Sequence, residues 1–355
     1  MAAVPGFCPA VRDRLLSGAV IPAHPLALDA RRRLDERRQR ALTRYYLAAG
    51  AGGIAVGVHT TQFAIRDSAV GLYEPVLALA AETADEWRGD ARAPVIRIAG
   101  IVGPTRQAVA EATAAADLGY HLGLLSYGGI QDSNTISLLD RARAVAEAIP
   151  LMGFYLQPAV GGIPLGYEFW REFCEIENAA AIKVAPFNRY ATLEVMRAVC
   201  DSGRAGEIAL YTGNDDNIVA DLLMKFAAGG SETGFVGGLL GHWAIWTRPA
   251  CRYWQRCRQA ADGPYGSADP SLLRLNAEVT DANAAVFDVR NAFAGCIAGI
   301  HEVLRRQGLM QGIWCLDKSE GLSAGQIEEI DRVCRAYPHL ADDEFVAENL
   351  DTWLR

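Results

Sequence analysis

The sequence predicts an α/β fold, a (β/α)8 TIM barrel with a C-terminal helical extension. Short apolar segments alternate with amphipathic helical patterns over most of the chain. The apolar segments are hydrophobic at nearly every position, which is typical of parallel strands buried on both faces. After residue 262 only helical patterns follow. We therefore expect the barrel over residues 1–262 and the helical extension over residues 263–355.

Eight segments have the length and composition of buried strands. They are Gly18–Ala23, Gly52–Val58, Pro94–Ala99, Leu122–Ser126, Pro150–Leu156, Ala179–Ala185, Glu207–Tyr211 and Thr233–Val236. A doubly wound sheet is the alternative arrangement. Its first strand usually runs into a glycine-rich phosphate-binding turn. Here the first strand runs into Pro22-Ala23-His24-Pro25, which favours the barrel.

Helical patterns separate the expected strands, and several end at a glycine, a common helix stop. The expected barrel helices are Arg31–Ala49, Thr105–Leu118, Thr135–Ala148, Gly166–Glu177, Tyr190–Ser202, Asn217–Ala228 and Arg248–Ala261. A turn-rich linker is expected at 262–270. Helices are then expected at Ser271–Gln307 and Ser323–Tyr337.

The composition is that of a globular protein, with 51% hydrophobic and 21% charged residues. The net charge of −8 opposes binding to nucleic acids and to anionic membranes. No apolar run is long enough to span a membrane, and the first residues do not form a secretory signal. The eight cysteines are scattered and form no C-x-x-C motif. These features predict a cytoplasmic protein with reduced thiols and no metal site.

Lys183 is the most informative residue, because it lies within the apolar strand Ala179–Ala185. The chain contains only two other lysines, Lys225 in an expected helix and Lys318 in a loop, and both are expected to be exposed. Burial disfavours an ammonium ion and lowers its pKa, and a neutral amine attacks carbonyl groups to form a Schiff base. The alternative is a lysine at the barrel rim that extends to water.

Polar groups follow two other strands at the same end of the expected barrel. Tyr155 ends the strand before that of Lys183, where a phenol can transfer protons, or simply pack at the rim. His59, Thr60 and Thr61 follow the second strand and can bind a carboxylate. Asp215 and Asp216 suggest a cation site, but a cap for the following helix is the favoured interpretation.

Several of these segments together resemble the dihydrodipicolinate synthase and N-acetylneuraminate lyase family of class I pyruvate-type aldolases. The matching segments are His59–Phe63, Ile98–Gly100, Tyr155-x-x-Pro158, Ile182–Ala185, Gly213–Asp216 and Leu322–Ile330. The resemblance covers nearly the whole chain, and it implies a barrel with a helical extension that assembles into a homodimer or homotetramer. It implies Lys183 as the Schiff-base lysine, Tyr155 as the general acid or base, and no cofactor.

Departures from the family pattern point to a divergent member rather than to dihydrodipicolinate synthase itself. The family's Gly-Thr-Thr-Gly-Glu segment is here Val58-His59-Thr60-Thr61-Gln62, so either His59 or Thr60 takes the place of the first threonine. The family's arginine after Tyr-x-x-Pro falls near Val160. Glycine at 128 stands where a second tyrosine is usual. The 2-oxo-acid half of the family site is retained, and the second substrate stays open.

The sequence therefore predicts a lyase or aldolase that acts on pyruvate or a related 2-oxo acid through an enamine at Lys183. A 2-keto-3-deoxy sugar acid dehydratase that uses the same imine is a close alternative. A catalytically silent protein that binds a 2-oxo acid on the same barrel is a second alternative. A metal-dependent barrel enzyme is a third, with little support from the scattered histidines and aspartates.

Overall fold

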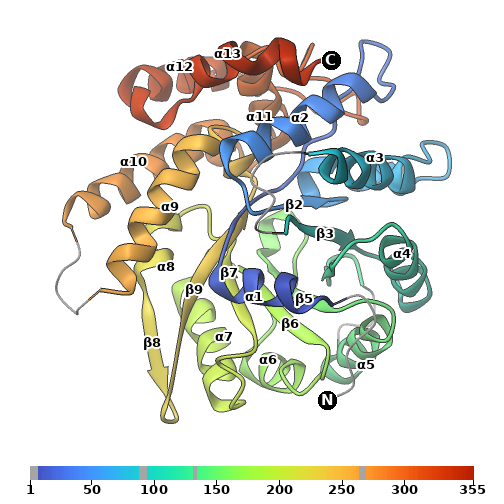
Figure 1. Ribbon diagram of the computed structural model, residues 1–355, viewed down its shortest axis with the longest axis vertical. Coiled ribbons are helices and arrows are strands. Elements are labelled where there is room, and N and C mark those ends of the chain that lie inside the picture. The colour runs from blue at the N-terminus through green and yellow to red at the C-terminus, as the bar shows by residue number, and fades with distance from the viewer. Residues whose placement is uncertain (1–6, 88–93, 131–133, 264–268) are drawn as a thin grey trace.

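The computed structural model describes residues 7–87, 94–130, 134–263 and 269–355. In this part of the chain eight parallel strands form a nearly closed TIM barrel, with neighbours in the order β1-β9-β7-β6-β5-β4-β3-β2 (Figure 1). A bridge between Ala23 and Ala55 joins the two ends of this order. The strands are β1 (Val20–Pro22), β2 (Gly53–Val56), β3 (Ile96–Ile101), β4 (Leu122–Leu125), β5 (Leu151–Leu156), β6 (Ala179–Ala185), β7 (Ala209–Thr212) and β9 (Ser231–Leu240). The predicted fold class is confirmed.

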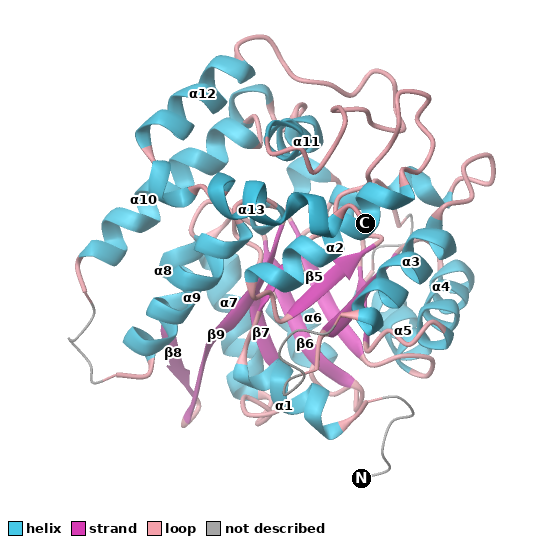
Figure 2. Ribbon diagram, turned by 45° about the horizontal axis from the view of Figure 1, so that its top comes forward, coloured by secondary structure: helices cyan, strands magenta, loops and turns pink. Residues whose placement is uncertain are grey.

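Helices surround the barrel and continue into the C-terminal extension (Figure 2). The barrel helices are α2 (Glu36–Ala49), α3 (Tyr73–Glu86), α4 (Thr105–Asp117), α5 (Thr135–Ala146), α6 (Tyr167–Phe173), α7 (Arg189–Asp201), α8 (Ile218–Leu223) and α9 (Thr247–Ala261). The extension contains α10 (Ser271–Val286), α11 (Cys296–Arg306), α12 (Gln326–Ala336) and α13 (Asp343–Trp353). The predicted linker at 262–270 lies mostly outside the described residues.

Two apolar clusters make up the core, as the alternation of side chains along buried strands requires. One cluster fills the barrel interior and includes Ile98, Met152 and Phe154. The other lies between the strands and the surrounding helices and includes Tyr155 and Val184. Helix α1 (Pro9–Ser17) contributes Val11 and Leu15 to the interior cluster. Each strand residue therefore faces either the barrel interior or the helical layer, and only the first group can reach a site inside the barrel.

The structure corrects several predicted boundaries. The expected helix Asn217–Ala228 ends at Leu223, because residues Lys225–Ala228 form strand β8, which pairs antiparallel with β9. The turn between them is Gly229-Gly230, and both glycines have positive φ, so the chain reverses where a helix was expected to stop. Helix α2 starts at Glu36 rather than Arg31, since the Asp35 side chain accepts a hydrogen bond from the backbone of Arg38.

The expected single helix Ser271–Gln307 is interrupted between α10 and α11. The connector, residues 287–295, contains the short 3-10 helix Val289–Asn291 and three non-glycine residues with positive φ, Asp288, Ala292 and Phe293. The sequence prediction also omitted α1, α3 and α13.

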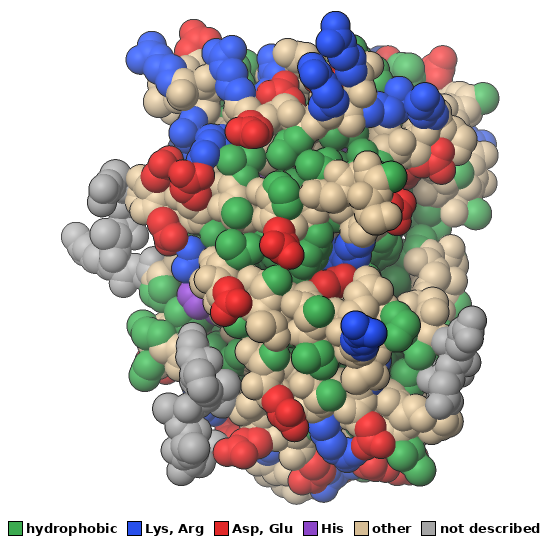
Figure 3. Space-filling model, turned by 90° about the vertical axis from the view of Figure 1, so that its right-hand side faces the viewer, with side chains coloured by type: hydrophobic (Ala, Val, Ile, Leu, Met, Phe, Trp, Pro, Cys, Tyr) green, Lys and Arg blue, Asp and Glu red, His purple; other side chains and the backbone are tan. Residues whose placement is uncertain are grey.

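No helix in the described part of the chain is long and apolar enough to cross a membrane. On the face drawn in Figure 3, basic and acidic side chains are interspersed.

Candidate active site

A cavity of about 70 Å³ lies at the C-terminal end of the barrel. Strand ends β1, β2, β5, β6, β7 and β9 contribute to its wall, together with the connector between α10 and α11. The lining residues are Ala23, Val58, His59, Thr60, Phe154, Leu156, Gln157, Val160, Lys183, Ala185, Phe187, Gly213, Asp215, Gly241, Phe287, Phe293 and Cys296. In TIM barrels this end of the strands is where active sites are built.

Lys183 projects from β6 into this cavity and is only 9% exposed. Its partner in the β5–β6 register is Phe154, and Nζ lies 4.3 Å from the centroid of the Phe154 ring. Burial removes the water that stabilises an ammonium ion and therefore lowers the pKa of Lys183, an effect partly opposed by the carboxyl group of Asp215. The amine is consequently deprotonated more readily than a lysine in solution.

Gly213 leaves the space in which the Lys183 side chain lies. A Cβ at position 213 would stand 2.6 Å from Cε of Lys183 and 2.8 Å from Cβ of Ala185. Neither distance is compatible with van der Waals contact. A side chain at position 213 would therefore displace the lysine.

Asp215 is the second ionisable group in the cavity. Burial raises the pKa of Asp215, and the nearby Lys183 opposes that rise. Its Oδ1 is buried and accepts no hydrogen bond from any residue that the structure describes. Helix α10 holds the segment in place, because Nδ2 of Asn283 donates to the backbone carbonyl of Asp215 at 2.7 Å. The residue thus combines an unsatisfied carboxyl oxygen with a position beside the reactive amine.

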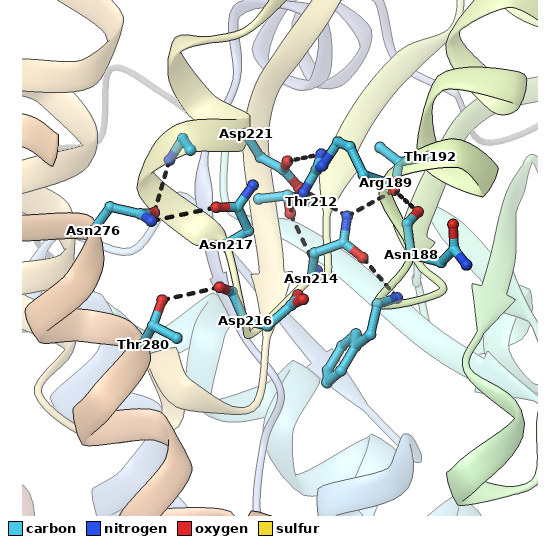
Figure 4. Close-up of polar contacts among 12 residues, drawn as sticks. Asn188, Arg189, Thr192, Thr212, Asn214, Asp216, Asn217, Asp221, Asn276 and Thr280 are labelled. Atoms are coloured by element: carbon cyan, nitrogen blue, oxygen red, sulfur yellow. Dashed lines mark hydrogen bonds and ion pairs between the residues drawn. The ribbon is translucent and has the colours of Figure 1, made fainter.

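A polar network connects the loop after β6 with the loop after β7, which contains Asp215 (Figure 4). The buried carboxylate of Asp221 accepts hydrogen bonds from Thr212 at 2.6 Å and from Asn214 at 2.9 Å. Oδ1 of Asn214 accepts from the backbone N–H of Phe187 at 3.0 Å. Thr280 of α10 donates to the backbone carbonyl of Asp216 at 2.9 Å. The loops after β6 and β7 are therefore held relative to each other and to the extension.

The segment after β2 divides into residues that reach the cavity and one that does not. His59 lines the cavity, and burial together with the charge of Lys183 lowers the pKa of its imidazole to about 4. Thr60 also lines it, but its hydroxyl donates to the backbone carbonyl of Ala23 at 2.8 Å. Thr61 lies outside the lining; its hydroxyl donates to the carbonyl of His24 at 2.6 Å and accepts from the backbone of Gly57 at 3.0 Å. Its role is to shape the loop.

Tyr155 is not among the residues that line the cavity. It pairs with Val184, one position beyond the Phe154–Lys183 pair, so its side chain faces the helical layer and not the cavity. The ring centroid lies 5.6 Å from that of Trp170, and the hydroxyl accepts a hydrogen bond from the backbone of Leu165 at 3.3 Å. Alternation along the strand explains this placement, and the role of Tyr155 as the acid or base stays a prediction.

Sequence reasoning did not assign the aspartate to the site. Asp215 was expected to cap the following helix, yet the N-cap of α8 is Asn217, and the Asp215 carboxyl belongs to the cavity. A signal was present, since the segment Gly213–Asp216 follows a strand end adjacent to that of Lys183. No sequence pattern pointed to Phe287 and Phe293, which also line the cavity, because both come from the distant extension.

Within the described residues no group of three or more His, Cys, Asp or Glu side chains is placed to hold a metal ion. The eight cysteines are free, and Cys296 is the one that reaches the cavity. The lining therefore offers four ionisable groups, Lys183, Asp215, His59 and Cys296. Burial raises the pKa of the Cys296 thiol, which keeps it protonated.

Fold and site together describe a TIM-barrel protein with C-terminal helices and a buried lysine at the end of β6. Among solved structures its fold matches dihydrodipicolinate synthases and N-acetylneuraminate lyases. The synthase from Cyanidioschyzon merolae with lysine bound is 19% identical, with a TM-score of 0.74 over 91% of this chain and 99% of that chain. The Acinetobacter baumannii synthase complexed with pyruvate is 19% identical, with a TM-score of 0.71 over 89% and 97%.

The N-acetylneuraminate lyase from Fusobacterium nucleatum complexed with pyruvate is 16% identical, with a TM-score of 0.69 over 91% of this chain and 98% of that chain. No protein-family model matches the chain, and no curated protein matches it. At these identities the likeness establishes a shared fold, as expected for a divergent member of this structural group.

Proposed function

We propose that the protein is a class I lyase that forms a Schiff base between Lys183 and the carbonyl carbon of a small 2-oxo acid such as pyruvate. The observation that carries this proposal is the buried amine of Lys183 in a cavity at the C-terminal end of the barrel strands. Two proteins of the same fold have been determined as complexes with pyruvate. The low pKa of the amine supports nucleophilic attack near neutral pH.

Asp215 is proposed to transfer protons in this reaction. When Lys183 attacks the carbonyl, the resulting carbinolamine must lose its oxygen as water, and a protonated carboxyl supplies the proton. The carboxylate left behind then accepts a proton from the carbon next to the iminium, which converts the iminium into an enamine. Burial keeps the pKa of Asp215 above that of an ordinary aspartate, so both protonation states are accessible near neutral pH.

The enamine carbon then attacks an aldehyde, or in the reverse direction forms as a C–C bond breaks, and water releases the product from Lys183. The iminium nitrogen accepts the electron pair when the C–H or C–C bond breaks; when the enamine attacks, nitrogen donates that pair and the aldehyde oxygen takes up a proton. A positively charged imine therefore supplies the electron sink that a Lewis-acid metal supplies in other aldolases.

His59 is proposed to contact the substrate carboxylate. Its depressed pKa keeps the imidazole neutral at pH 7, and a neutral imidazole retains one N–H donor. Thr60 contributes to the wall of the cavity, since its hydroxyl proton already engages Ala23. The expected homodimer or homotetramer stays a prediction that sedimentation velocity would test.

Borohydride trapping with pyruvate tests the proposal. We expect one reduced adduct per chain, located at Lys183 by peptide mass spectrometry, and no adduct at this position in Lys183→Met. Because the sequence has only two other lysines, Lys225 and Lys318, each serves as an internal reference. An adduct on either of them that persists in Lys183→Met would contradict the assignment. Adduct formation without turnover of any aldehyde would instead favour a binding protein.

A further inference from the structure

Two phenylalanines from separate parts of the chain meet in the wall of the cavity. Phe187 follows β6, and Phe293 belongs to the connector between α10 and α11. Both line the cavity, and their ring centroids lie 6.0 Å apart with the planes at 68°. This edge-to-face contact is a favourable arrangement for two aromatic rings. The pair joins the barrel to the extension across the cavity that contains Lys183.

Both residues have a backbone conformation that bulky side chains rarely adopt. The φ angle is 50° at Phe187 and 68° at Phe293. In this region an L-amino acid brings Cβ close to the following carbonyl group, so glycine is normally found there. Such strain persists only where surrounding interactions impose it, and it is concentrated at ligand-binding sites.

Specific hydrogen bonds impose the conformation on each side. The backbone N–H of Phe187 donates to Asn214, which is itself bound to the buried Asp221. The N–H of Phe293 donates to the backbone carbonyl of Asp288 at 3.0 Å. The Asp288 carboxylate in turn accepts from the backbone of Gly295 at 3.0 Å and from Ser323 at 2.5 Å. Both rings are therefore anchored by buried or half-buried polar groups.

The cavity that the two rings help to line is small. The cavity of about 70 Å³ holds several water molecules, since each needs roughly 10–15 Å³. It is well below the roughly 150 Å³ of an apolar protein cavity that binds benzene. The lining also offers few groups that could bind the hydroxyls of a sugar chain, because Thr60 is engaged by the backbone. Lys183, Asp215, His59 and Gln157 are its other polar side chains.

We infer that the Phe187–Phe293 pair is a size filter that restricts the carbonyl compounds reaching Lys183 to short, unbranched ones. This inference rests on the proposed function, because it takes the amine of Lys183 as the group that reacts with the carbonyl compound. The substrate class that follows is a 2-oxo acid or aldehyde of about three or four carbons. Aryl-substituted and sugar-derived carbonyl compounds are excluded by the rings.

Reductive alkylation of the three lysines tests the filter without requiring catalysis. The full chain is treated with acetaldehyde or with benzaldehyde in the presence of cyanoborohydride, and alkylation of Lys183 is measured relative to the exposed Lys318. In the wild type we expect the Lys183:Lys318 ratio to be at least ~10-fold lower for benzaldehyde than for acetaldehyde, the discrimination that a tightly fitting wall provides.

Phe293→Gly removes one ring and keeps the backbone, because glycine adopts positive φ without strain. It is expected to bring the benzaldehyde ratio to within about threefold of the acetaldehyde ratio. Phe187→Gly tests the other ring in the same way. Phe345→Ala is the matched control; it removes a half-buried phenylalanine of the extension that packs on Tyr45 and Trp353, away from the cavity lining. This control is expected to retain the wild-type discrimination.

Equal ratios for the two aldehydes in the wild type would overturn the filter, as would unchanged discrimination in both glycine variants. Lys183 that is silent toward both aldehydes in all variants would also overturn it, since the rings would then not control access. These outcomes are separate from the pyruvate test. A chain that discriminates by size but forms no pyruvate adduct retains the filter and loses the proposed activity.

Discussion

Lys183 faces Phe154 across neighbouring strands, with Nζ 4.3 Å from the centre of the aromatic ring. The residue beside the amine is thus a phenyl group without a hydroxyl. Tyr155, one position further along β5, lies on the opposite face of the strand. We therefore propose Asp215, which lines the cavity, as the group that transfers protons at Lys183.

Tyr155→Phe should leave turnover within about threefold of the wild type, because the phenol reaches the Leu165 backbone and not the cavity. A positioned general acid or base would cost roughly 10²–10⁴ in rate if it were removed. The measurement is the steady-state rate with pyruvate and an aldehyde, alongside borohydride trapping. A large loss of turnover with unchanged trapping would restore Tyr155 as the proton-transfer group.

Asp215→Asn should lower turnover by roughly 10²–10⁴ and also slow imine trapping on Lys183, because the proposed carboxyl supplies the proton that removes water from the carbinolamine. The carboxylate raises the pKa of Lys183, so its removal should also move the rise of the trapping rate to lower pH. Asp216→Asn is the matched control, because the neighbouring carboxyl lies outside the cavity lining. Equal turnover in the two variants would remove Asp215 from the mechanism.

Gly213→Ala should reduce imine formation by at least ~10-fold, since the new methyl group would occupy the position of the Lys183 side chain. Gly206→Ala provides the comparison, because a Cβ at that position meets no atom within 4 Å. Trapping rates and thermal unfolding of both variants separate a displaced lysine from a general loss of stability. Wild-type trapping in Gly213→Ala would show that the lysine has another route into the cavity.

The rate of imine formation should increase with pH as Lys183 loses its proton, with the midpoint of that rise well below 10.5, the ordinary pKa of lysine. It should decrease again at higher pH as Asp215 loses the proton that it supplies. The rate rises with pH because only the neutral amine attacks the carbonyl. Burial lowers the pH at which Lys183 loses its proton. His59 should add no transition near pH 6.5, since its pKa is lowered to about 4. Initial trapping rates between about pH 5 and pH 10 measure this profile. A midpoint close to 10.5 would indicate an exposed amine.

Excess EDTA should leave turnover unchanged, because the imine acts as the electron sink in the proposed reaction. The assay compares the same enzyme before and after dialysis against the chelator. Loss of activity that Zn²⁺ or Mg²⁺ restores would favour the metal-dependent alternative.

The sequence by itself determined the succession of the eight barrel strands and of most helices between them, because fully buried parallel strands are apolar throughout and glycines stop the helices. It also indicated Lys183, since a charged residue is costly to bury within the apolar strand Ala179–Ala185. Both conclusions rest on neighbours along the chain. That is the information a single sequence carries directly.

Only the tertiary structure decided which side chains accompany the lysine. The β5–β6 register assigns Phe154 to the interior and Tyr155 to the helical layer, and a shift of one residue would exchange them. Asp215 reaches the cavity because Asn283 of α10, far along the chain, holds its backbone. Phe293 lines the cavity from a connector that local sequence patterns predict as continuous helix. Each of these placements depends on contacts between residues distant in sequence, and local hydrophobic periodicity contains no information about such contacts.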